Sequence, residues 1–137
     1  MRWKIEVFHK ILKSGCKAED SKLHTADRLA NLMVVFCILS WRVFWLTMLN
    51  RATPDANPTI ALTSNEIALL DRLVIDAGNR RCRPATLSFY LTKLARLGGY
   101  LARAGDAPPG NTVMWRGLTR LTDIEIGSEI AGGNVGN

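Results

Sequence analysis

A nearly unbroken apolar run over residues 29–49, LANLMVVFCILSWRVFWLTML, constrains the fold of this chain more than any other feature. As a helix, the run is long enough to cross a bilayer. Its Leu, Ile, Val and Phe side chains would contribute roughly −3 to −6 kcal/mol to insertion, whereas Arg42 near its centre would cost about 2.5 to 3.5 kcal/mol. Basic residues flank both ends and therefore indicate no orientation. The run has to be covered either by protein or by lipid.

The first fourteen residues carry a second helical pattern. At about 100° per residue, one carboxylate and four basic side chains share one stripe. These residues are Arg2, Glu6, His9, Lys10 and Lys13. Ile5, Phe8 and Leu12 fall on a separate arc and predict an apolar seam against the core. By composition, the stripe fits either a solvated face with i,i+4 ion pairs or a metal-binding carboxylate beside phosphate-binding cations.

The order of these residues resembles a known signature. Arg2-x3-Glu6-x6-Lys13, within the string RWKIEVFHKILKSG, resembles the Tyr/Arg/Glu/Lys signature of bacterial cut-and-paste transposases of the transposon-five type, in the insertion-sequence-four family. The signature's Tyr would precede Met1. In that family the Glu is the third carboxylate of an Asp-Asp-Glu triad on an RNase-H-like core. The resemblance therefore implies that Glu6 is a catalytic and metal-binding residue.

The resemblance also assigns ligands to the stripe. DNA cleavage and strand transfer are in-line displacements, in which two Mg²⁺ ions held by carboxylates stabilise the attacking and leaving oxygens. Arg2 and Lys13 would bind phosphates near the transposon end, with His9 and Lys10 adding contacts. The family's two catalytic Asp residues precede its Glu, and this chain has no Asp before Glu6. We therefore expect a relic carboxylate in a chain that alone holds no Mg²⁺ and is inactive.

Composition is typical of a globular protein with a polyanionic partner. The apolar and charged fractions are 47% and 22%, and the formal net charge is +6. Positive charge favours DNA as a partner. The three cysteines, Cys16, Cys37 and Cys82, are widely spaced and indicate reduced thiols, not a disulfide framework or a zinc site. The cysteines predict a cytoplasmic protein, and the resemblance implies that it acts on no small-molecule substrate.

Polar residues 50–60, NRATPDANPTI, predict a linker. After it, Thr63 and Glu66 form a capping-box pattern that opens a helix expected over residues 64–75. The basic segment 76–83 is expected to be a solvated loop that could contact DNA phosphate. The predicted domains are 1–50, the end of a catalytic domain; 51–62, the linker; 63–130, a helical dimerisation domain; and 131–137, a flexible tail.

Two more helices are expected in the C-terminal half. The first runs from Pro84 to about Arg103, and a close neighbouring helix or a helix break would explain Gly98 and Gly99 within it. Asn111 caps the second helix. The apolar residues of the two helices are Leu87, Leu91, Leu94 and Leu101 in the first and Trp115, Leu118 and Leu121 in the second.

Two segments of this half, ARLGGYL over residues 95–101 and WRGLTRL over 115–121, again resemble the same transposases. In the family they fall in the region that carries the dimerisation helices. Taken on their own, the apolar residues of these segments would be core. The candidates for a dimer interface are Leu94, Leu97, Gly98, Gly99, Leu101, Trp115 and Leu118.

The chain lacks a long β-patterned segment, so the predicted fold is all-α: orphaned C-terminal helices of an RNase-H-like domain, followed by a small helical dimerisation bundle. The family has an apolar helix packed on its catalytic sheet where residues 29–49 fall, which favours protein over lipid as the cover. We expect the C-terminal portion of a DDE transposase, with DNA and transposase protomers as partners. The alternatives are a regulatory protein that forms mixed dimers with intact transposase and a small membrane-associated protein.

Overall fold

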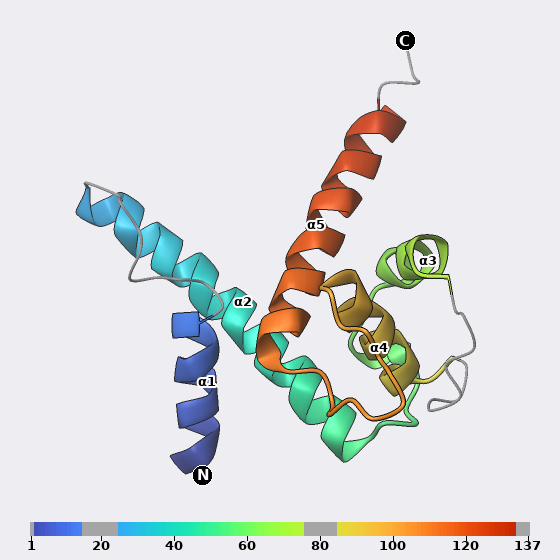
Figure 1. Ribbon diagram of the computed structural model, residues 1–137. Coiled ribbons are helices and arrows are strands. Elements are labelled where there is room, and N and C mark those ends of the chain that lie inside the picture. Colours follow the sequence, from blue (N-terminus) through green and yellow to red (C-terminus); the bar gives the residue numbers. More distant parts are fainter. Residues whose placement is uncertain (1, 15–24, 76–84, 134–137) are drawn as a thin grey trace.

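The computed structural model describes residues 2–14, 25–75 and 85–133, which form an all-helical fold without strands in those ranges (Figure 1). The helices are α1 (Arg2–Ser14), α2 (Ala26–Ala52), α3 (Ser64–Leu73), α4 (Leu87–Leu97) and α5 (Asn111–Gly133), with a 3₁₀ turn, η2, at Pro58–Ile60. The predicted all-α class is confirmed. The predicted basic loop over residues 76–83 lies outside the described residues, as do Cys16 and Cys82.

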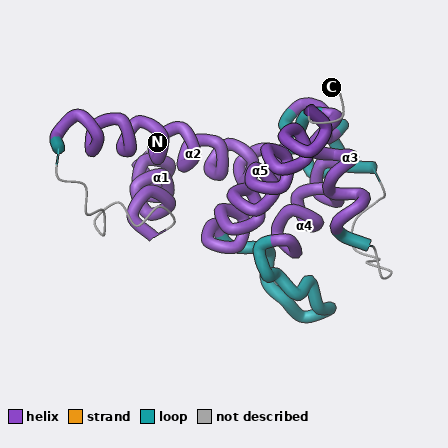
Figure 2. Tube along the Cα trace, turned by 90° about the horizontal axis from the view of Figure 1, so that it is seen from above, coloured by secondary structure: helices purple, strands orange, loops and turns teal. Residues whose placement is uncertain are grey.

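The long helix α2 joins the two parts of the molecule. α1 packs against α2, and so do α4 and α5 from the C-terminal bundle. Figure 2 shows α1 beside one part of α2, with α3, α4 and α5 gathered around its other end. The buried residues of α2 are Ser40, Val43 and Leu46, which lie in its second half.

Most of the apolar run in α2 is exposed. By length and composition, α2 could cross a membrane. Only 17% of the residues in its most apolar stretch are buried. Val34, Ile38 and Trp41 are 58%, 62% and 55% exposed. Trp41 stacks on Trp45, with ring centroids 5.5 Å apart. The described part of the chain therefore covers one side of the run and leaves the rest open.

A single hydrophobic core continues across the predicted linker. Ile11 and Val43 from the N-terminal helices belong to the same buried cluster as leucines of the C-terminal bundle. The linker itself docks on the start of α4, where the amide of Leu87 donates to the carbonyl of Ala56 at 2.8 Å. The leucines of this cluster include Leu70, Leu91, Leu94, Leu118 and Leu121.

The predicted capping box opens α3. Thr63 Oγ1 accepts a hydrogen bond from the amide of Glu66 at 3.1 Å, and Glu66 Oε2 accepts one from the amide of Thr63 at 2.9 Å. These reciprocal bonds satisfy amides that a helix start otherwise leaves unpaired. The helix ends at Leu73, before the predicted end at Ile75, because Val74 is already extended.

The helix α4 is shorter than the sequence predicts. It ends at Leu97 because Gly99 adopts a left-handed φ of 99° and the amide of Tyr100 donates to the carbonyl of Ala95 at 2.9 Å. This arrangement is a Schellman motif, which stops a helix. Leu101 follows the break and is 64% exposed, so the prediction that it is one of the apolar residues of this helix is wrong.

Two glycines allow α4 and α5 to cross in close contact. A Cβ atom at Gly98 would lie 1.9 Å from the carbonyl oxygen of Val113, and one at Gly117 would lie 2.0 Å from that of Leu94. Only glycine fits at either position without moving a backbone. The expected close approach of a neighbouring helix at Gly98 is confirmed. α5 continues to Gly133, so the start of the predicted tail is helical.

A buried lysine ties α3 to α4. Lys93 is 4% exposed, and its Nζ donates to Asp71 Oδ1 at 2.7 Å. The Tyr90 hydroxyl donates to the other carboxylate oxygen at 3.0 Å, and Nζ lies 4.8 Å from the centroid of the Phe89 ring. The hydrogen bond from Lys93 is the main reason that the pKa of Asp71 lies below its ordinary value of 3.8. Partial burial opposes this lowering, whereas the bond from Tyr90 and the charge of Lys93 add to it.

We expect Asp71→Asn to lower the free energy of unfolding by about 1 to 2 kcal/mol at neutral pH, because it removes the charge that accepts the hydrogen bond from the buried ammonium of Lys93. A lowered pKa in the folded state gives stability that is present above the unfolded value and is lost as the pH falls through the folded value. Urea unfolding of both proteins between about pH 7 and pH 2 measures the difference. It should shrink below the ordinary pKa of 3.8. A difference that stays constant over the whole range would contradict the assignment.

Candidate nucleic-acid interface

The basic stripe of α1 faces solvent. Glu6, His9, Lys10 and Lys13 are all exposed. Arg2 begins the helix, but its side chain is not among those that the structure describes. The structure therefore places every described member of the predicted stripe on one accessible helical face.

The opposite face of α1 holds the helix in place. Ile11 is 1% exposed and belongs to the core cluster, against which Val7 also packs. At about 100° per residue, Ile11 lies nearly opposite the centre of the stripe. The predicted seam is corrected on two counts, since Ile5 is 59% exposed and Ile11 was not included in it. The contact with α2 selects the buried residues, so the apolar pattern of α1 alone identifies them only in part.

The donor set around Glu6 does not fit the pair of Mg²⁺ ions that the resemblance implies for a complete enzyme. Glu6 is the one acidic residue of α1. Within the described ranges, no group of three or more His, Cys, Asp or Glu side chains could hold a metal ion. Mg²⁺ is held by several hard oxygen ligands. What this face can do with its own residues is contact phosphates through its cations.

Most of the predicted dimer-interface residues pack inside the chain. The crossing of α4 and α5 buries or half-buries Leu94, Leu97, Gly98, Trp115 and Leu118. Gly99 and Leu101 are exposed. The structure thus brings the two C-terminal motifs together in an intramolecular contact. The dimer interface stays a prediction, and fully buried members could serve it only if α4 and α5 separated.

Sequence reasoning missed the partner of Gly98 on the other helix. Gly117 lies within the quoted motif WRGLTRL but was given no role of its own. A glycine inside a predicted helix was the available signal, because it costs about 1 kcal/mol relative to alanine unless a close approach requires it. The geometry gives it that reason, since its Cα faces the backbone of Leu94.

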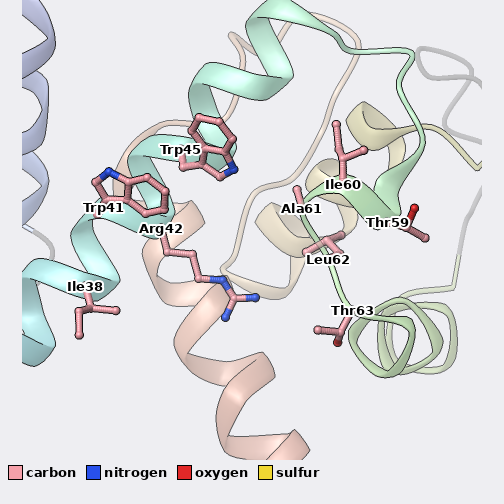
Figure 3. A pocket seen from close by; sticks show the side chains of 9 residues that line it. All are labelled: Ile38, Trp41, Arg42, Trp45, Thr59, Ile60, Ala61, Leu62 and Thr63. Carbon is pink, nitrogen blue, oxygen red and sulfur yellow. The ribbon is translucent and has the colours of Figure 1, made fainter.

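An ion pair joins α2 to α3 beside an apolar hollow (Figure 3). Arg42 Nη2 donates to Glu66 Oε1, and the two side chains are 35% and 3% exposed. Figure 3 shows Arg42 reaching from α2 toward Thr63, at the start of α3. The hollow has a volume of about 440 Å³. Its apolar walls are formed by Ile38, Trp41, Trp45, Ile60, Ala61 and Leu62.

Sequence reasoning also missed this ion pair. Arg42 was considered only as a cost of membrane insertion, and Glu66 only as a helix cap. An arginine within an apolar run is itself a signal, because a buried charge needs an opposite charge. The partner could not be named, since it lies 24 positions away.

No protein-family model matches this chain. Its candidate interface is therefore defined by its own residues. These are the exposed cations and the single carboxylate of α1. The buried Ile11 on the opposite face of α1 packs into the core and holds the helix in place.

Proposed function

We propose that this chain is the C-terminal part of a DDE transposase of the transposon-five type and that α1 contacts DNA phosphates. One observation carries the proposal: Glu6, Lys10 and Lys13 are exposed on the face of α1 that lies opposite the buried Ile11. A helix anchored from behind presents these groups in a fixed arrangement. The net charge of +6 favours a polyanion as the partner.

The residues suggest a division of roles. Glu6 is the third carboxylate of the triad, and no Asp precedes it in this sequence. Lys10 and Lys13, with Arg2 and His9, bind phosphates near the transposon end. The chain binds DNA in the cytoplasm. In the complete enzyme, the same face takes part in DNA cleavage and strand transfer.

Duplex DNA binding, measured by fluorescence anisotropy over a series of salt concentrations, tests the stripe. Replacing both Lys10 and Lys13 with Gln should weaken binding. The slope of log K against log salt should become shallower by about 0.9 for each phosphate contact that is lost. The matched control replaces Arg72 and Arg116 with Gln, because both are exposed and lie on α3 and α5. Equal effects in the two double variants would show that α1 makes no particular contact.

A hybrid enzyme tests the role of Glu6. In the hybrid, this chain replaces the corresponding C-terminal part of an active transposase of the same type. We expect DNA cleavage by the hybrid and its loss in Glu6→Gln, which keeps the shape of the side chain but removes the charge of the proposed third carboxylate. Glu129→Gln on α5 is the control, since Glu129 is also exposed. Full cleavage by Glu6→Gln would contradict the assignment.

A regulatory protein that forms mixed dimers is a second candidate. The end of α5 extends beyond the bundle (Figure 1), and Ile126 and Ile130 on it are 50% and 64% exposed. Exposed apolar residues on a projecting helix suit pairing with another helix. Mixing the chain with intact transposase in a transposition assay should then reduce the yield of product. An undiminished yield would exclude this role.

A further inference from the structure

A second hollow lies where α1, the end of α2 and the start of α5 meet. Its volume is about 420 Å³, and it is lined by Lys10, Arg51 and residues 108–112. No acidic side chain lines it. Both cations are exposed, so a ligand in the hollow can reach them.

The packing of the helices brings the two cations to the same hollow. Lys10 comes from the basic stripe of α1, and Arg51 comes from the last turn of α2. Their relative positions are fixed because α1 packs on α2 and also contacts α5. Two cations beside one concave surface concentrate positive potential there.

The chain segment on the third side of the hollow adds no opposing charge. It reads Pro108-Pro109-Gly110-Asn111-Thr112. The carbonyl of Gly110 accepts the bond from the amide of Met114 at 3.2 Å, and glycine offers no side-chain acceptor to the first turn of α5. The dipole of α5 therefore adds a small positive contribution, while Lys10 and Arg51 supply the full charges.

We propose that this hollow holds a phosphate of the DNA backbone, with Arg51 as a phosphate-binding residue that lies outside the predicted stripe. The inference rests on the proposed function, because Lys10 belongs both to the stripe and to the hollow. A backbone that follows the exposed face of α1 as far as Lys10 would meet Arg51 in the same hollow. The planar guanidinium suits two oxygens of a phosphodiester.

Arg51→Gln and Arg72→Gln form a matched pair for the test. Each arginine is exposed and lies in the last turn of its helix, but Arg72 does not line the hollow. In the anisotropy titration with labelled duplex DNA, Arg51→Gln should reduce the slope of log K against log salt by about one, and Arg72→Gln should leave it unchanged. Arg51→Lys keeps the charge and should retain the slope. Circular dichroism checks that all three variants are helical.

The outcomes separate this inference from the proposed function. If the Lys10 and Lys13 double variant weakens binding while Arg51→Gln matches Arg72→Gln, the hollow takes no DNA phosphate and only the inference fails. If the unaltered chain does not bind duplex DNA, both fail. If inorganic phosphate protects Arg51 from a guanidinium-directed reagent but duplex DNA does not, the hollow is a site for free anions and the inference is overturned.

Discussion

Replacing Gly117 with valine is expected to lower the free energy of unfolding by about 3 kcal/mol or more. Even the first added carbon would lie 2.0 Å from the carbonyl oxygen of Leu94. No rotamer relieves this contact, because both atoms are fixed by helix backbones. α5 would have to move away from α4, which would open the core around Leu118 and Leu121.

Gly127→Ala provides the control within the same helix. Nothing lies within 4 Å of a Cβ built at Gly127, so alanine fits there and should stabilise the fold by about 0.5 to 1 kcal/mol through its better helix propensity. Urea unfolding followed by circular dichroism measures both variants. A small loss in Gly117→Val, similar in size to the change in Gly127→Ala, would mean that the two helices do not cross in contact.

Local signals predicted several elements of this fold. The capping box at Thr63 and Glu66 specified the start of α3, because its two hydrogen bonds join residues three positions apart. A helix break at Gly98 and Gly99 and the close approach of a neighbouring helix were anticipated as alternatives. The structure shows that both occur, since a glycine that ends α4 also leaves room for the backbone of α5.

The candidate site was predictable only in part. The stripe of α1 could be identified because charged residues at helical spacing share a face whatever the helix packs against. Its buried face could not, since Ile5 and Ile11 are equally apolar and only the position of α2 buries Ile11. The contribution of Arg51 to a hollow shared with Lys10 likewise depends on how separate helices meet.

Replacing Glu66 with alanine should destabilise the chain almost as much as Gly117→Val, by about 2 to 4 kcal/mol. One oxygen of the Glu66 carboxylate accepts a hydrogen bond from the amide of Thr63, and the other accepts one from the guanidinium of Arg42. Its side chain is only 3% exposed, so water cannot replace either partner. One substitution thus removes both a helix cap and the ion pair between α2 and α3.

A double-mutant cycle separates the two roles of Glu66. Glu66→Gln keeps an oxygen for the amide of Thr63 but loses the charge that pairs with Arg42, so its cost should lie below that of Glu66→Ala. Arg42→Met should cost less again, because the Arg42 side chain is 35% exposed. In the double variant Arg42→Met/Glu66→Gln, the loss should be smaller than the sum of the single losses, since residues in contact are coupled. Strict additivity in urea unfolding would mean that the pair contributes nothing.

The exposed Asn65, bonded to Glu125 at 2.8 Å, supplies a control, because Asn65→Ala should change stability by no more than about 0.5 kcal/mol.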